Sequence, residues 1–209
     1  MSRGTLLQPG CFYHIYNRGN NRENLFIEER NYPYFLRLYG QYISPIADTY
    51  AYCLMRNHYH LLIRVKDHIQ ELDSGDQIAE QSDSSTLDLS NANRAFQLLF
   101  GTYAKAINKA YKRTGKLFEE HFDRIEVTND RYFTNLIFYI HFNPQKHKFV
   151  DDFRDWPWSS YGAFISTGKT KLKRDDVLDW FGGTNRFKEF HKGAADEKMI
   201  EMLIGDDFD

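Results

Sequence analysis

Short stretches of apolar and β-forming residues recur along the chain and predict strands. Residues 12–16 alternate between the two faces of an extended chain, the pattern of a half-buried strand. In all, strands are expected at residues 12–16, 48–55, 58–65 and 121–128. Since only Arg56-Asn57 separates the second strand from the third, we expect these two to form a hairpin.

Longer stretches place apolar residues three and four positions apart, which is the spacing of a helix with one buried face. Such helices are expected at residues 28–43, at residues 91–113 and over about thirteen residues after Asn129 or Asp130, either of which can cap the helix. Proline disfavours helical geometry in the residue before it, so the first helix ends at Ser44-Pro45 and the third is expected to stop before Pro144. Thr114-Gly115 ends the second helix.

The predicted elements follow the order β-α-β-β-α-β, with one further helix. This order is typical of the ferredoxin-like split βαβ fold, an α+β architecture, here with an antiparallel sheet of four to five strands covered by helices. We expect one domain over residues 1–165, interrupted by a mobile acidic insert at 68–90 that is rich in Ser, Asp and Gln. Residues 166–209 are expected to form a polar and acidic extension.

The charge of the chain is unevenly distributed, although its net value is only −2. Residues 68–90 contain six acids and no Lys or Arg, and residues 196–209 contain six acids and one Lys. The rest of the chain therefore carries 26 basic and 17 acidic residues, a net charge of +9 that favours a polyanionic partner. The alternative is that the acidic stretches simply keep the chain soluble.

Composition excludes several classes of protein. The 209 residues include no apolar run near the ~20 residues that span a bilayer, and the first ten residues contain no apolar signal-peptide core. Cys11 and Cys53 make neither a disulfide framework nor a CxxC pair, so we expect a protein of the reducing cytoplasm with no membrane partner. Collagen-like and coiled-coil classes are excluded as well.

Two histidines stand in one predicted strand. His58 and His60 share a face of that strand with Leu62 and Arg64, because side chains two positions apart point the same way. Their imidazoles, about 7 Å apart along the strand, can converge on one metal ion. A bare pair of this kind is also compatible with two ordinary polar residues on a half-exposed strand.

A tyrosine and an asparagine lie four residues apart in the third predicted helix. Tyr139 and Asn143 therefore sit above one another on a flank of the apolar stripe. A tyrosine hydroxyl can act as a covalent nucleophile, and an asparagine oxygen can help to coordinate a hard cation. Alternatively, Tyr139 is one of many half-buried tyrosines and Asn143 merely ends the helix. His141 is a rival ligand that projects to the opposite side of the helix.

Basic residues near these elements are candidates for contacts with DNA phosphates. The candidates are Arg18 and Arg22 in an Asn/Gly-rich turn, Arg64 on the histidine face, and the stripe of Lys105, Lys109, Lys112 and Lys116. Lys and Arg in such positions set the register of a nucleic acid without reading its sequence. The competing interpretation is that they form ordinary solvated surface.

Several stretches resemble the REP-associated tyrosine transposases, which are similar to the IS200-like single-tyrosine transposases with a His-hydrophobic-His (HUH) signature. MRNHYHLLI resembles the signature itself. YHIYNRGNNRENLF resembles the first strand and turn of the family, TGKLFEEHFDRIEV its fourth strand, and YIHFNPQKHKFVDDFRDWPWSSY its NP and W-x-W-SS-Y segment. These blocks occur in the expected order and cover about residues 11–165.

The resemblance implies a set of site residues and a reaction. His58 and His60 match the paired metal ligands, Tyr139 matches the nucleophile, and Asn143 matches a polar third ligand. The implied reaction is metal-dependent cleavage and rejoining of single-stranded or hairpin DNA through a 5′-phosphotyrosine intermediate, as in DNA transposition or REP-element processing. Mg²⁺ or Mn²⁺ suits the mixed nitrogen and oxygen ligands, and Zn²⁺ is also compatible with two histidines.

The chain departs from the family pattern at three places. Arg56 stands where the family usually has Pro, residues 145–147 read QKH instead of the commoner VRA, and the insert and the extension have no counterpart. Two other functions remain open at this point: a catalytically inactive protein that binds hairpin DNA, and a two-histidine oxygenase, which would need a carboxylate ligand. The oligomeric state is open between monomer and homodimer.

Overall fold

The computed structural model describes residues 6–67 and 84–192, and of residues 84–91 the backbone alone. Its elements are β1 (Phe12–Arg18), η1 (Asn20–Arg22), α1 (Asn31–Tyr42), β2 (Ala47–Leu54), β3 (His58–Val65), α2 (Ser84–Ala110), β4 (Asp123–Glu126), α3 (Asp130–Lys146), η2 (Phe153–Asp155), α4 (Tyr161–Ile165), α5 (Arg174–Phe181) and α6 (Thr184–Phe190). The predicted order of strands and helices is confirmed through α3.

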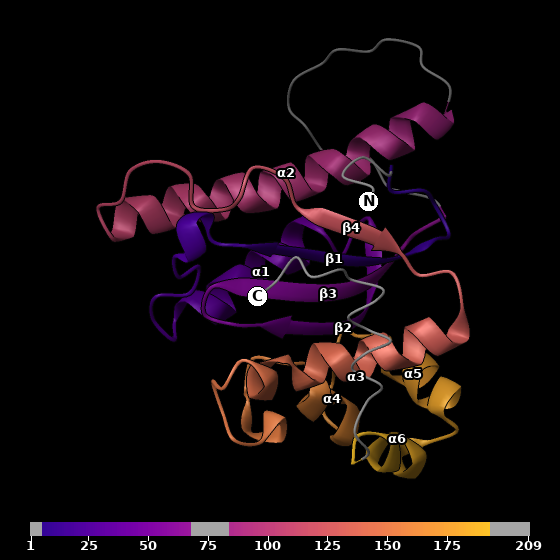
Figure 1. Ribbon diagram of the computed structural model, residues 1–209. Coiled ribbons are helices and arrows are strands. Elements are labelled where there is room, and N and C mark those ends of the chain that lie inside the picture. Colours follow the sequence, from indigo (N-terminus) through magenta and orange to yellow (C-terminus); the bar gives the residue numbers. More distant parts are fainter. Residues whose placement is uncertain (1–5, 68–83, 193–209) are drawn as a thin grey trace.

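The four strands form one antiparallel sheet in the order β2-β3-β1-β4 (Figure 1). This is the strand order of the ferredoxin-like fold, so the predicted fold class is confirmed. In the β1–β3 pairing, Arg18 lies opposite His58, and Phe12 lies opposite Arg64 at the other end. The start of β3 and the end of β1 therefore meet at one end of the sheet.

Both faces of the sheet are covered by helices. One hydrophobic cluster joins the sheet to α1 and α2, and a second joins it to α3, α4, α5 and α6, which gather on the other side in Figure 1. Strand β3 divides its residues as predicted: Tyr59 and Leu61 belong to the α1/α2 cluster, and Leu62 belongs to the α3 cluster. Because α3 covers the histidine face, His58 and His60 are buried and do not lie on a half-exposed strand.

Helix α2 differs from the prediction at both ends. Its apolar stripe of Phe96, Leu99, Tyr103 and Ile107 is buried, as expected. It begins at Ser84 and not at 91, so the end of the predicted insert is helical, while residues 68–83 lie outside the described residues. The helix ends at Ala110, and Lys112 adopts a left-handed backbone with φ of 52°.

The prediction that α3 stops before Pro144 is wrong. Asn129 caps the helix, since its side chain accepts a hydrogen bond from the Tyr132 N–H, and the helix runs from Asp130 through Pro144 to Lys146. Proline removes one helical N–H donor, but the N–H of His147 still reaches the carbonyl of Asn143 at 2.9 Å. Both Pro144 and the preceding Asn143 are buried, and this burial outweighs the local preference.

The described part of the C-terminal extension packs onto the α3 side of the molecule. Val177 in α5 and Phe187 in α6 are fully buried in the α3 cluster. The backbone of edge strand β2 is bonded to this region as well, since the N–H of Lys173 donates to the carbonyl of Thr49 at 2.9 Å. Within the described residues, no helix combines the length and the apolar character needed to cross a membrane.

Candidate active site

The two histidines of the HYH motif stand side by side at the start of β3. His58 is 5% exposed and His60 is fully buried, and their ring centroids are 5.4 Å apart with the rings nearly perpendicular. Strand alternation points both rings toward α3, because the intervening Tyr59 points to the α1/α2 side.

Hydrogen bonds to the Nδ1 atoms orient both rings. His58 Nδ1 lies 2.8 Å from Asn57 Oδ1, and since an amide oxygen can only accept, Nδ1 carries the proton and Nε2 keeps its lone pair. His60 Nδ1 lies 2.9 Å from Nε2 of His14, a buried neighbour on β1. Partners of this kind fix the tautomer of a metal-binding imidazole.

Burial keeps these imidazoles neutral. Loss of hydration lowers the pKa of His58 to about 3, with the nearby His147 and Arg18 contributing in the same direction. Burial lowers the pKa of His14 to about 3 and that of His60 well below its usual range. Neutral imidazole is the form that binds metal ions, so the pair is in the required protonation state at neutral pH.

Helix α3 brings Tyr139 and Asn143 to the histidines. The ring of Tyr139 lies 5.5 Å from that of His60 and 6.4 Å from that of His14. The amide Nδ2 of Asn143 donates to the Tyr139 carbonyl at 2.9 Å. Its Oδ1 is buried and has no hydrogen-bond partner among the described residues. A buried oxygen of this kind can act as a ligand to a divalent cation whose other positions are filled by water or phosphate.

Three residues at the site were missed by the sequence reasoning. His14 is one, and the others are His147, whose ring lies 4.8 Å from that of His58, and Lys146, whose Nζ lies 5.6 Å from the centroid of the Tyr139 ring. His147 follows Asn143 by four residues, so helical spacing would have revealed it had the helix been continued past Pro144. His14 could be found only from the register of β1 against β3.

The donor set fits a divalent cation of mixed ligand preference. His58 and His60 offer ring nitrogens, and Asn143 offers a buried amide oxygen. Within residues 6–67 and 84–192, no group of three or more His, Cys, Asp and Glu side chains could hold a metal ion. The oxygenase alternative, which needs a carboxylate beside the histidines, therefore finds no support there.

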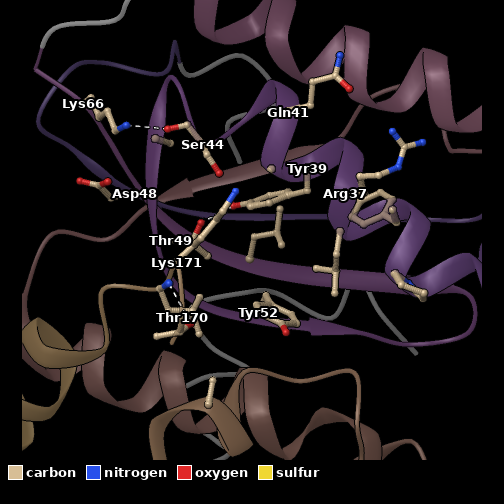
Figure 2. A pocket seen from close by; sticks show the side chains of 18 residues that line it. Arg37, Tyr39, Gln41, Ser44, Asp48, Thr49, Tyr52, Lys66, Thr170 and Lys171 are labelled. Atoms are coloured by element: carbon tan, nitrogen blue, oxygen red, sulfur yellow. Dashed lines mark hydrogen bonds between the residues drawn. The ribbon is translucent and has the colours of Figure 1, made fainter. Parts of the chain in front are cut away.

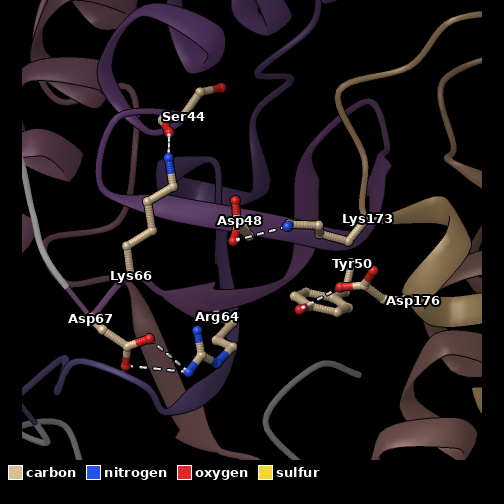
Figure 3. Close-up of polar contacts among 8 residues, drawn as sticks. All are labelled: Ser44, Asp48, Tyr50, Arg64, Lys66, Asp67, Lys173 and Asp176. Atoms are coloured by element: carbon tan, nitrogen blue, oxygen red, sulfur yellow. Dashed lines mark hydrogen bonds and ion pairs between the residues drawn. The ribbon is translucent and has the colours of Figure 1, made fainter.

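The predicted DNA contacts are only partly near the histidines. Arg18 lies opposite His58 in the sheet, and its Nε forms an ion pair with Glu119 at 2.6 Å. Arg22 is exposed in η1, just beyond the end of β1. Arg64 shares the histidine face but stands at the far end of β3, where it is paired with Asp67 (Figure 3).

The predicted lysine stripe is divided in the structure. Lys105 and Lys109 are exposed on α2, whereas Lys112 and Lys116 follow the helix and so do not continue its face. Lys116 forms an ion pair with Glu120 at 3.4 Å. Since α2 packs on the face of the sheet opposite α3, none of these lysines joins the histidine site.

A cavity of about 950 Å³ lies elsewhere, at the β2 edge of the sheet. It is lined by α1, β2 and residues 170–172, with the Tyr39 hydroxyl bonded to Thr49 at 2.8 Å on its wall (Figure 2). The lining includes none of the histidines, Tyr139 or Asn143. The cavity is therefore separate from the candidate active site.

The resemblance to single-tyrosine transposases implies a ferredoxin-like sheet with two neutral histidines on one strand, next to a tyrosine on the helix that follows the fourth strand. No family model matches the chain. The chain is 26% identical over 117 residues to a protein of Haemophilus influenzae named "Putative REP-associated tyrosine transposase"; the match covers 54% of this chain. It spans 58% of that relative, less than two thirds of its length.

A solved structure has a similar fold. It is described as the "Structure of the REP associates tyrosine transposase bound to a REP hairpin" and superposes with a TM-score of 0.55 at 16% identity, over 88% of this chain and 96% of that one. The resemblance to REP-associated tyrosine transposases inferred from the motifs is thus confirmed, in sequence by the curated relative and in fold by the solved structure.

Proposed function

We propose that this protein cleaves and rejoins single-stranded DNA next to a hairpin through a covalent link to Tyr139. The observation that carries the proposal is the placement of the Tyr139 ring 5.5 Å from His60, together with the buried Asn143 Oδ1 one helical turn away. The solved relative bound to a REP hairpin supports hairpin DNA as the substrate class.

The reaction is an exchange of two phosphate esters. The Tyr139 oxygen attacks a backbone phosphorus, a Tyr–O–P bond forms, and the bond from phosphorus to the 3′-oxygen breaks. The phenol proton is lost and the 3′-oxygen gains a proton, so the products are a 5′-phosphotyrosine and a free 3′-hydroxyl. No ATP is needed because the covalent intermediate conserves the ester bond.

A divalent cation, Mg²⁺ or Mn²⁺, would neutralise charge on the scissile phosphate, which typically contributes several kcal/mol. His58, His60 and Asn143 would hold it. The chain's own contribution is orientation. Hydrogen bonds of the Nδ1 atoms with Asn57 and His14 orient the rings of His58 and His60, and the Asn143 amide donates to the Tyr139 carbonyl. In this proposal, β3 would present the two histidine ligands, and α3 would present Asn143 and the nucleophile.

The site is closed in this structure. Tyr139 is 5% exposed, so a DNA phosphate can reach it only if a covering side chain moves. Lys146 is half-buried, and its Nζ lies over the Tyr139 ring. Its ammonium can also pair with the incoming phosphate, so opening of the site and DNA binding are coupled in this proposal.

The test is formation of a protein–DNA adduct that survives denaturing electrophoresis. The wild-type chain is incubated with Mn²⁺ and an end-labelled hairpin that carries a single-stranded extension. Tyr139→Phe should abolish the adduct. Tyr132→Phe is the matched control, because Tyr132 lies two turns earlier on α3 and its buried hydroxyl has no hydrogen-bond partner among the described residues.

The outcomes separate the candidate functions. An adduct that persists in Tyr139→Phe excludes this nucleophile. Tight hairpin binding by the wild type without an adduct, with Mg²⁺ or with Mn²⁺, would instead favour a protein that binds the hairpin and has lost cleavage. Loss of the adduct in both tyrosine variants would show that α3 is merely sensitive to substitution.

A further inference from the structure

A second cavity opens beside β4, at the edge of the sheet. Its volume is about 670 Å³, within the range of roughly 300–1,000 Å³ that is common for sites of small organic groups. One wall is formed by α2 and the other by residues 116–122. Of the residues that line it, Lys116 alone is among the predicted DNA contacts.

This cavity lies next to the end of the sheet that carries the histidines. The segment on its wall continues along β1, because Phe118 forms a bridge with Gly19 and the Glu119 N–H donates to the carbonyl of Arg18. Arg18 is in turn the register partner of His58. Two strand spacings therefore separate the cavity wall from His58, roughly 10 Å.

The lining has the chemistry of nucleobase recognition. Phe100 and Phe122, whose centroids are 5.5 Å apart, offer half-buried aromatic surface on which a flat ring can stack. The amides of Asn93 and Gln97 line the same cavity, and amide side chains form paired hydrogen bonds with base edges.

The charges of the lining favour a neutral ring over a phosphate. The cations Lys116 and Arg124 are balanced by the carboxylates Glu119 and Glu120. Lys116 is paired with Glu120 within the wall. Arg124 contacts Asn93, and its buried Nε has no hydrogen-bond partner among the described residues.

A glycine keeps the cavity open. Gly101 lies inside α2, where glycine is unfavourable compared with alanine, and it lines the cavity. A Cβ at this position would meet nothing within 4 Å. The backbone therefore tolerates a side chain here, and a large one would project into the space that a ligand would fill.

We propose that this cavity between α2 and residues 116–122 binds one unpaired base of the single-stranded DNA that flanks the hairpin. The proposal rests on the proposed function for its substrate class. The base stacks on one of the two phenylalanine rings, Phe100 and Phe122, which meet at 62°, and presents its polar edge to the amides of Asn93 and Gln97. The strand then runs past Arg18 toward the histidines.

The test uses equilibrium binding without metal, so that cleavage plays no part. A fluorescent hairpin with a single-stranded extension is titrated with wild type, Gly101→Trp and the control Gly162→Trp; Gly162 is exposed on α4 and equally open around a Cβ. Gly101→Trp should weaken binding by roughly tenfold, the loss of one stacked base, and the control should match wild type.

An abasic scan of the extension identifies the bound group. In wild type, one abasic position should weaken binding by roughly tenfold, and in Gly101→Trp the same change should have no further effect. Equal binding by the two tryptophan variants would overturn the proposal, as would a weakened Gly101→Trp with no abasic position that matters. The adduct assay on the same samples judges the cleavage proposal separately.

Discussion

The two faces of the sheet bury polar groups in different ways. On the α1/α2 face, the hydroxyls of Tyr13, Tyr39 and Tyr103 are buried and each is hydrogen-bonded. On the α3 face, His14 Nδ1 and Asn143 Oδ1 are buried with no hydrogen-bond partner among the described residues. Tyr59 and Arg124 are exceptions on the first face, since the Tyr59 hydroxyl and the Arg124 Nε have no such partner either.

This difference indicates which buried polar groups contribute to stability and which are available for chemistry. A buried polar atom without a partner costs about 1–3 kcal/mol, and native proteins keep few of them. On the α3 face these atoms cluster around Tyr139 and the histidines, where a ligand could satisfy them. We therefore expect the hydrogen-bonded hydroxyls on the α1/α2 face to contribute stability, and the polar groups under α3 to contribute function at some expense of stability.

The largest contrast is expected within α3 itself. Leu136→Ala should lower the free energy of unfolding by about 2–5 kcal/mol, because Leu136 is fully buried in the α3 cluster. Asn143→Ala should change it by less than about 1 kcal/mol, since loss of the unpartnered oxygen and the better helix propensity of Ala offset the lost volume. Denaturant titration measures both; a large loss in Asn143→Ala contradicts the comparison.

Acid should destabilise the α3 face through His191. Burial lowers its pKa to about 4 from 6.5, so the unfolded chain takes up the proton first as the pH falls. The contribution of His191 to stability is therefore complete above pH 6.5 and falls by about 3 kcal/mol by pH 4. His191→Gln, which keeps an acceptor for His141, should reduce the slope of pH-dependent unfolding by this share, while the other buried histidines keep theirs; an unchanged slope contradicts the assignment.

Metal should stabilise the protein through the same face. With free Mn²⁺ at a hundredfold excess over its dissociation constant, the free energy of unfolding should rise by about 2.7 kcal/mol. His58→Gln should remove this rise, whereas His121→Gln, at an exposed position, should retain it. Thermal unfolding with and without Mn²⁺ measures the effect, and an equal rise in both variants would place the metal elsewhere.

The smallest contrast compares the same chemical change on the two faces. Tyr103→Phe removes a buried hydroxyl that donates to the Leu25 carbonyl at 2.9 Å, and should lower the free energy of unfolding by about 1 kcal/mol. Tyr132→Phe removes a buried hydroxyl with no hydrogen-bond partner among the described residues, and should leave the free energy unchanged or raised. If denaturant titration shows an equal loss of unfolding free energy in both variants, the proposed difference between the two faces is wrong.

The sheet was predictable because its signals are local. The strand containing the HYH motif was expected at residues 58–65 and is found at His58–Val65, since alternation and the two-residue separation from the strand before it define a hairpin. Helix α3 was likewise predicted by helical spacing, and its apolar residues Phe133, Leu136 and Ile140 are buried. A single sequence shows which residues share a face of a strand or of a helix, because these faces repeat every two and every 3.6 residues.

Long-range contacts decided the rest. Tertiary packing carries α3 past Pro144, and this placed His147 beside His58, contrary to the local rule for proline. His14 meets His60 only through strand register, which one sequence does not encode in a readable way. His141, considered as a ligand, is instead bonded to His191 and Ser160 on the far side of α3, as its angle around the helix indicated.

The central claim is that Tyr139 is the residue that becomes linked to DNA, and peptide mapping tests it most directly. The wild-type chain is reacted with Mn²⁺ and an end-labelled hairpin with a single-stranded extension, digested with protease and nuclease, and analysed by tandem mass spectrometry. We predict a nucleotide on the α3 peptide at Tyr139 and on no other tyrosine. A nucleotide on another residue, with Tyr139 unmodified, would contradict the account.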